Sequence, residues 1–334
     1  MVDPPALSIV FFGTPAFAAP TLEAMLQSHH RVAGVVCQPD RPSGRGQKAR
    51  AGPVKALATE AGLPVLQPER LKDPAFLQSL SALRPDLGVV AAYGRIIPEP
   101  IINTPRFGLI NVHASLLPRY RGAAPIQRAV MAGERETGVT IMRIVKELDA
   151  GAMFAKRVRP IPLDATSGEV ERDLATAGAR LLVDVVNAIA VGTAREEPQD
   201  DSLATYAPKV TREESTIDWT RSALAIHNQV RGLSPWPRAS TSLAGARIIV
   251  SRTWPEGVAG GAGIAGTKVP ALQVMAPHGS ADPGTIVEAA GEAIRVATGD
   301  GMLSILELQP EGKRVMTARE FLAGHVVQPG LRFA

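Results

Sequence analysis

Residues 86–92 read DLGVVAA, and every residue after Asp86 in this stretch is apolar or glycine. A strand with one face in solvent would alternate polar and apolar residues, because successive side chains point to opposite faces of a sheet. An unbroken apolar run predicts instead a strand buried on both faces, as in a parallel sheet covered by helices. Outward along the chain, the same texture predicts strands at Leu7–Phe12, Arg31–Val36, Gly108–Val112 and Val139–Val145.

Helices are expected between these strands. Pro15–Leu26 and Val54–Glu60 have helical spacing of apolar side chains, and a longer pattern of this kind runs from Ser167 to Ala190. Strands that alternate with helices indicate an α/β fold with a doubly wound, Rossmann-like sheet. We assign this domain to residues 1–192.

The remainder of the chain has a different texture. Residues 193–208, TAREEPQDDSLATYAP, lose apolar periodicity and gain charge, so we expect a linker there. Residues 209–334 then form a second domain, in which short strands separated by Gly-rich turns favour a small OB-like β-barrel. The strands are expected at 247–251, 284–287, 293–297 and 302–308, after a short helix at 223–230. A Gly- and Ala-rich loop, residues 255–282, interrupts them.

Composition describes a globular protein that suits an anionic partner. With 334 residues and 45% hydrophobic content, the chain can build two domains. Its formal net charge is +4 and its pI about 9.4. No secretory signal begins the sequence and no apolar run reaches the roughly 20 residues of a membrane helix, so we expect a cytoplasmic protein without a membrane partner. The single cysteine, Cys37, has apolar neighbours that indicate a buried, inert thiol.

A basic segment follows the second predicted strand. The stretch RPSGRGQKARAGPVK, residues 41–55, carries five cations and no acidic residue: Arg41, Arg45, Lys48, Arg50 and Lys55. Such a charge run forms either a solvated loop or a surface for a polyanion. Composition leaves both interpretations open.

Asn111 and His113 stand two residues apart where the run Gly108–Val112 ends. If the strand continues through them, both side chains lie on one face with Cα atoms roughly 7 Å apart, at the sheet edge where ligands bind. An amide and an imidazole there could serve catalysis, but a histidine at a strand end is also a common structural residue.

Other kinds of chemistry lack their motifs. The first strand ends in FGTPAFAA, with one glycine where a dinucleotide fingerprint needs three, and no phosphate-binding P-loop occurs. The sequence also has no Gly-x-Ser-x-Gly elbow, and its six histidines lack metal-ligand spacing. We therefore expect neither a serine nucleophile nor a metal.

Seven segments stand out along nearly the whole chain: IVFFGTPAFAAP, QPDRPSGRGQKARAGPVKALA, AAYGRIIP, GLINVHASLLPRYRGAAPIQ, ETGVTIMRIVKELDAGAMF, SPWP (234–237) and VATGDG (296–301). In these residues and in this order, the chain resembles the methionyl-tRNA formyltransferase family, within the formyltransferase superfamily.

This resemblance implies formyl transfer from the co-substrate 10-formyltetrahydrofolate to the α-amine of methionyl initiator tRNA. Asn111 would donate a hydrogen bond to the oxyanion formed by amine attack, and His113 would handle protons. Asp149 would orient the imidazole or relay protons through water. The family also implies folate contacts for the loop of Ser115, Leu116, Leu117 and Pro118, opposite a wall formed by residues 91–97.

For the RNA, the resemblance places the basic loop, with Arg41, Arg45, Lys48 and Arg50, against the acceptor end, while the second domain cradles the acceptor arm. Two rivals remain. A formyltransferase for a small amine, such as a sugar nucleotide, would share Asn111, His113 and Asp149, but the basic loop and second domain argue against it. A noncatalytic RNA-binding protein would not need these three residues together.

Overall fold

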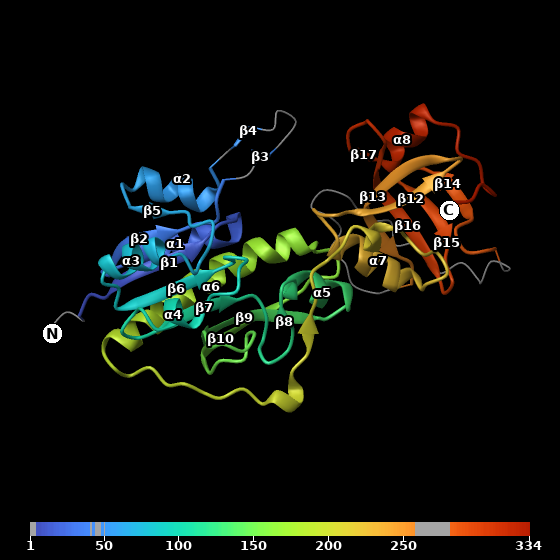
Figure 1. Cartoon of the computed structure of the whole chain (residues 1–334). Coiled ribbons are helices and arrows are strands. Elements are labelled where there is room, and N and C mark those ends of the chain that lie inside the picture. Colours follow the sequence, from blue (N-terminus) through green and yellow to red (C-terminus); the bar gives the residue numbers. More distant parts are fainter. Residues whose placement is uncertain (1–4, 41, 44–47, 50, 258–280) are drawn as a thin grey trace. The chain divides into compact units, whose positions relative to one another are not determined.

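The structure is a computed structural model that describes residues 5–40, 42, 43, 48, 49, 51–257 and 281–334. The chain divides into two compact units (Figure 1). The first unit takes its residues from 1–125, 136–160 and 171–208, and the second from 126–135, 161–170 and 209–334. The predicted domain boundaries, at residues 192 and 209, stay predictions.

A seven-stranded sheet forms the centre of the first unit, in the order β10-β9-β7-β6-β1-β2-β5. Strands β1, β2, β5, β6 and β7 run parallel. This confirms the predicted Rossmann-like α/β fold. The strands are β1 (Ser8–Gly13), β2 (Arg31–Val36), β5 (Val65–Leu66), β6 (Leu87–Ala91), β7 (Leu109–His113), β9 (Glu136–Arg143) and β10 (Met153–Pro160).

Helices bury both faces of this sheet, as the unbroken apolar runs predicted. On one face, Gly178 in α6 lies so close to β7 that a methyl group there would meet Val112 Cγ1 at 2.7 Å. On the other face, Phe76 and Leu80 of α3 pack in one cluster with residues such as Phe12 and Leu109. The helices are α1 (Ala19–Gln27), α2 (Pro53–Glu60), α3 (Pro74–Ala82), α4 (Glu99–Ile102), α5 (Pro125–Met131) and α6 (Ser167–Ala190), with a 3-10 turn, η1 (Ala16–Ala18).

Strand β9 departs from the expected parallel arrangement, because it runs antiparallel to β7 and to β10. Its central residues are buried, as its apolar sequence predicted. Continuous apolarity reports burial on both faces and not strand direction. Strand β10 escaped prediction because it is the edge strand, and most of its residues are half-buried or exposed.

Residues 193–208 form an extended segment, here called the strap, with little regular structure of its own (Figure 1). It is not a free tether. Glu197 exchanges two backbone hydrogen bonds of 2.8 Å with Met153, and β11 (Tyr206–Ala207) pairs parallel with β8 (Arg121–Gly122). A 3-10 turn, η2 (Asp201–Leu203), lies between these attachments. The expected linker is therefore fixed along the first unit by backbone pairing.

An antiparallel sheet with the strand order β12-β13-β16-β15-β14 forms the second unit, and β17 pairs with β16. Residues 330–334 join its two edge strands. Ser242 of β12 exchanges backbone hydrogen bonds with Ala334, while Ile286 N of β14 donates to Leu331 O at 2.8 Å. The sheet thereby closes on itself, in agreement with the predicted barrel. The strands are β12 (Ala239–Leu243), β13 (Ala246–Pro255), β14 (Ile286–Ala290), β15 (Ala293–Ala297), β16 (Met302–Pro310) and β17 (Met316–Thr317).

The second unit also contains helix α7 (Ala223–Gly232), η3 (Glu213–Ser215) and α8 (Ala318–Gly324). Most of the predicted long loop at 255–282 lies outside the described residues. In the part of the chain that the structure describes, every helix is too short or too polar to span a bilayer. Burial raises the pKa of the Cys37 thiol to about 11, which keeps it protonated, in line with the inert role expected.

A buried polar cluster ties α7 to residues 161–170. His227 Nε2 donates to Leu163 O at 2.8 Å, and its Nδ1 lies 3.0 Å from Thr253 Oγ1. The Arg231 guanidinium donates to the carbonyls of Pro162 and Ala165. Desolvation lowers the pKa of His227 to about 4, so the imidazole stays neutral in the folded protein at neutral pH.

This buried imidazole makes stability depend on pH. Between about pH 6.5 and 4 the unfolded chain binds a proton at His227 that the folded chain does not, so stability falls as pH drops through that window. The full effect is about 3 kcal/mol. We expect His227→Gln to be less stable than wild type at pH 7 but to lose less on acidification. Urea unfolding at pH 7 and pH 5 measures this, and equal losses in the two proteins would contradict it.

Candidate active site

Asn111 and His113 lie at the carboxyl end of β7, as the sequence predicted. Both share a face of the strand, and that face is opposite to the one on which Val112 meets α6. Pairing of β7 with β6 on one side and β9 on the other fixes the backbone there. The two side chains are therefore held by the sheet and not by a mobile loop.

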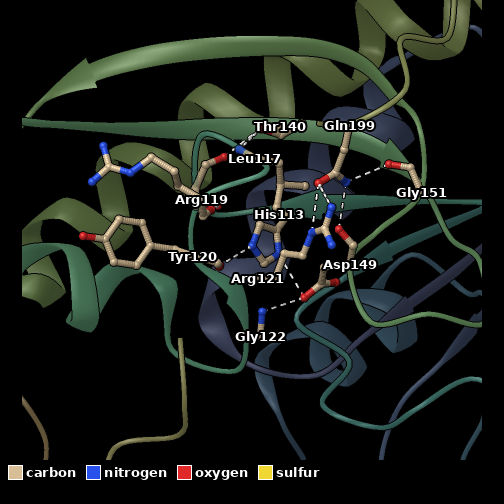
Figure 2. A network of polar contacts seen from close by, with 11 residues as sticks. His113, Leu117, Arg119, Tyr120, Arg121, Gly122, Thr140, Asp149, Gly151 and Gln199 are labelled. Atoms are coloured by element: carbon tan, nitrogen blue, oxygen red, sulfur yellow. Dashed lines mark hydrogen bonds and ion pairs between the residues drawn. The ribbon is translucent and has the colours of Figure 1, made fainter. Parts of the chain in front are cut away.

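The His113 ring is buried, with 5% of the residue exposed. Its Nε2 lies 3.0 Å from the carbonyl oxygen of Tyr120, and its Nδ1 lies 3.7 Å from Asp149 Oδ2 (Figure 2). A carbonyl oxygen can only accept a hydrogen bond, so Nε2 carries a proton and donates it. Nδ1 is left to face the carboxylate, across a gap too wide for a direct hydrogen bond.

Asp149 lies in the turn between β9 and β10 and has an unusual backbone. Its φ is 48°, in the left-handed region, which costs a residue with a side chain free energy unless its surroundings hold it there. Its carboxylate Oδ2 accepts the backbone N–H of Gly122 at 2.8 Å. That bond aims the same oxygen at His113, so the turn and β8 together position the carboxylate.

The strap supplies further contacts to this turn. The Gln199 side-chain Nε2 donates to the backbone carbonyls of Asp149 and Gly151, each at 2.8 Å. Its Oε1 accepts from Arg121 Nε at 3.0 Å and Nη2 at 2.9 Å. Arg121 Nη2 also pairs with Asp201 Oδ1 at 2.6 Å. Figure 2 shows the Gln199 amide between the Arg121 guanidinium and the backbone carbonyls of Asp149 and Gly151.

The loop after β7 is held by Thr140 of β9. The Thr140 hydroxyl donates to Ser115 O at 2.7 Å and accepts from Leu117 N at 3.2 Å. Ser115 is fully buried and donates to Arg119 O at 2.6 Å, while Leu117 packs against Met142 and Met153. Leu116 and Pro118 are half-buried. Ser115 and Leu117 therefore shape the loop, and its accessible surface comes from the other two.

Asn111 is half-buried, and its side-chain amide has no hydrogen-bond partner among the residues that the structure describes. An amide that carries two N–H donors is thus available beside a buried imidazole and a fixed carboxylate. Such a set can stabilise an oxyanion and exchange a proton.

Comparison with known proteins decides the family. A family model described as "Formyl transferase" matches residues 7–186, and one described as "Formyl transferase, C-terminal domain" matches residues 209–326. Methionyl-tRNA formyltransferase of Methylococcus capsulatus is 47% identical over 96% of this chain and 98% of its own. That of Moorella thermoacetica is 45% identical over 97% of this chain and 98% of its own. The chain belongs to the methionyl-tRNA formyltransferase family.

A solved structure has the same fold at lower identity. The N-formyltransferase from Helicobacter canadensis, determined with folinic acid and dTDP-3-aminofucose, superimposes with a TM-score of 0.64 at 16% identity. The match covers 90% of this chain and 99% of that one. At this identity the likeness supports the fold and not the substrate.

The structure brings the residues named from family resemblance into one region. His113 and Asp149 face each other, Asn111 shares the strand of His113, and residues 115–118 form the loop that follows. Their roles stay predictions. No group of three His, Cys, Asp or Glu side chains that could hold a metal occurs among residues 5–40, 51–257 and 281–334.

The basic segment is only partly described. Arg41, Arg45 and Arg50 lie outside the described residues, and Lys48 is described only as backbone of β4 (Lys48–Ala49), which pairs with β3 (Pro42–Ser43). Lys55 lies in α2, and its Nζ pairs with Asp40 Oδ2 at 2.5 Å. That hydrogen bond holds the pKa of the Asp40 carboxyl below its usual value.

Sequence reasoning missed Gln199, Thr140 and the Tyr120 carbonyl. Each of the three makes at least one hydrogen bond that involves a backbone carbonyl, and backbone groups leave no pattern of residue types in the sequence. The polar run EEPQDD around Gln199 looked like a solvated linker, and Thr140 lay inside a run predicted only as buried strand. No signal singled them out.

Proposed function

We propose that this protein transfers a formyl group from 10-formyltetrahydrofolate to the α-amine of methionine on initiator tRNA, for the start of translation. The observation that carries the proposal is the 43–47% identity, over nearly the full chain, to four relatives named methionyl-tRNA formyltransferase. The site supports it, because Asn111, His113 and Asp149 supply what formyl transfer needs. We expect the reaction in the cytoplasm, where translation takes place.

The reaction begins when the amine nitrogen attacks the formyl carbon. A C–N bond forms, and the carbonyl electrons move onto oxygen to give a tetrahedral oxyanion. The attacking nitrogen then loses a proton, N10 of the folate gains one, and the N10–C bond breaks. The products are N-formylmethionyl-tRNA and tetrahydrofolate, so each proton that leaves one nitrogen is balanced by one gained at another.

The three polar side chains divide this work. Asn111 donates an N–H to the developing oxyanion, for which its amide is available. His113, whose Nδ1 faces the Asp149 carboxylate across 3.7 Å, carries the proton between the two nitrogens. A proton on Nδ1 would create an imidazolium beside that carboxylate, and a water molecule in the gap could complete the relay.

The folate would lie along the loop of residues 115–118, where Leu116 and Pro118 offer apolar surface to a flat heterocycle. The family implies an opposite wall at residues 91–97. In that segment, Gln38 Nε2 donates to Tyr93 O at 2.6 Å, and Arg95 donates to the carbonyls of Pro68 and Glu69. These bonds hold the segment in place, which suits a preformed binding surface.

A competition between amines tests the substrate class. The protein is given 10-formyltetrahydrofolate with equal amounts of methionyl initiator tRNA and an amino-sugar nucleotide, and both products are quantified by mass spectrometry. We expect formyl on the methionine alone. Formyl on the sugar would support the small-amine alternative, and transfer to neither acceptor would contradict the proposal.

Arg45 is expected to set the preference for initiator tRNA. It lies between two glycines, in SGRGQK, and its planar guanidinium can stack on bases or bind phosphate. The family implies that it enters the acceptor stem, where the unpaired first position of the initiator is easier to open than a complete pair. Arg45→Ala should then lower the preference for the initiator, measured as kcat/KM for a mismatched stem divided by kcat/KM for a fully paired stem.

Lys55→Ala provides the control, because this lysine belongs to the same basic run but lies in α2 and pairs with Asp40. It should leave that ratio unchanged while it weakens tRNA binding and lowers the salt dependence of that binding. If Arg45→Ala also left the ratio unchanged, Arg45 would not discriminate between stems. The basic loop would then act at most by electrostatic attraction of the tRNA.

A further inference from the structure

Gln199 links the two loops that set the geometry between His113 and Asp149. One side chain makes four hydrogen bonds, two as donor to the Asp149 and Gly151 carbonyls and two as acceptor from the Arg121 guanidinium. It is half-buried between exposed neighbours in the strap. Both N–H groups and the oxygen of its amide are hydrogen-bonded within the protein, so the side chain stabilises other residues and does not bind substrate.

The turn at Asp149 needs such a support. A φ of 48° is costly for an aspartate, and free energy of about 1–3 kcal/mol favours another conformation unless contacts oppose it. The two carbonyls that accept from Gln199 belong to the peptide units 149–150 and 151–152. These hydrogen bonds therefore fix the orientation of both peptide units. Gly151 adds a constraint, because a side chain there would collide with the Arg143 carbonyl oxygen.

The Arg121 side of the contact reaches the same carboxylate by another route. Arg121 begins β8, and the next residue, Gly122, donates its N–H to Asp149 Oδ2. The backbone N–H of Arg121 donates to Thr205 O at 2.8 Å, so the strap also holds this loop by pairing. Gln199 thus connects the turn that carries Asp149 with the β8 loop, whose Gly122 N–H donates to the Asp149 carboxylate.

We infer that Gln199 is a positioning residue for catalysis, which holds the Asp149 carboxylate toward His113 through the turn of residues 149–151 and the β8 loop. This inference rests on the proposed function. A displacement of about 1 Å at a catalytic group can lower turnover by about 100-fold. Loss of the two Gln199 donors should therefore act on the chemical step and leave both substrates bound as before.

Gln199→Glu removes those donors and keeps the shape and the acceptors for Arg121, but it also replaces the N–H groups by a carboxylate oxygen that the two carbonyl oxygens repel. We expect kcat to fall about 10- to 100-fold, with KM for tRNA and for folate unchanged. Gln199→Met, which lacks donors and acceptors, should lose at least as much. Asp201→Asn is the matched control: it lies in the same strap and contacts the same arginine but not the turn, so kcat should stay at the wild-type value.

Amide hydrogen exchange gives a readout that does not need turnover. Residues 119–124 and 148–152 should exchange faster in Gln199→Glu than in wild type, and at the wild-type rate in Asp201→Asn. A Gln199→Glu protein with normal kcat and only a lower melting temperature would overturn the inference, as would an equal loss of kcat in Asp201→Asn. If wild type transfers no formyl group, the proposed function is wrong, and unchanged exchange in Gln199→Glu would then overturn the positioning role separately.

Discussion

His113→Ala is expected to lower kcat by at least about 100-fold, the usual scale for losing a positioned acid or base. The ring is buried between the Tyr120 carbonyl and the Asp149 carboxylate, so its removal takes away the proposed proton carrier of the site. Substrate affinity should change little, because the role concerns protons that move during the reaction. Single-turnover rates at saturating tRNA and folate measure the chemical step directly.

His113→Gln is the variant that separates chemistry from structure. Its amide can still donate to the Tyr120 carbonyl, but it cannot exchange a proton at neutral pH. The account predicts that it is as slow as His113→Ala while its melting temperature stays nearer to wild type. Turnover restored by glutamine would show that His113 serves as a hydrogen-bond donor and not as the proton carrier.

Asn111→Ala should slow the chemical step by about 100- to 1,000-fold, as expected for the loss of one oxyanion donor. The fold should tolerate this change, since the side chain is half-buried and makes no hydrogen bond among the residues described. A loss of activity in Asn111→Ala is therefore not expected to come from unfolding. The test is whether the substitution lowers kcat or raises KM.

Asn111→Asp sharpens it, because an isosteric carboxylate offers no donor and would repel the oxyanion. It should be at least as slow as Asn111→Ala. A raised KM with unchanged kcat in Asn111→Ala would instead mean that the amide binds substrate equally in the ground state and the transition state.

Burial was the most predictable property of the fold, because it leaves a direct trace in residue type. The parallel strands β1, β2, β6 and β7 and the long helix α6 appear within a residue or two of where apolar spacing placed them, whereas the short parallel strand β5 was not predicted. The predicted parallel direction of β9 was wrong, because its residues are buried on both faces whichever way the strand runs. The closing segment of the barrel, residues 330–334, makes only a few backbone pairs and carries no strand pattern.

The candidate site divides in the same way. The positions of Asn111 and His113 follow from strand period and from the rule that ligands bind at carboxyl ends. Asp149 was predicted only from the resemblance to the family. Its position depends on a turn with left-handed backbone, which no residue pattern predicts. Gln199 lies 50 residues further along the chain and bonds to backbone carbonyls of that turn, so its place beside the turn follows only from the three-dimensional fold.

The most direct test of the central claim is the mass of the amino acid released from initiator tRNA after reaction. The wild-type protein is incubated with methionyl initiator tRNA and 10-formyltetrahydrofolate, the aminoacyl ester is hydrolysed, and the free amino acid is weighed by mass spectrometry. The account predicts N-formylmethionine with wild type and almost only methionine with His113→Ala in the same time. Unmodified methionine from the wild-type reaction would contradict it.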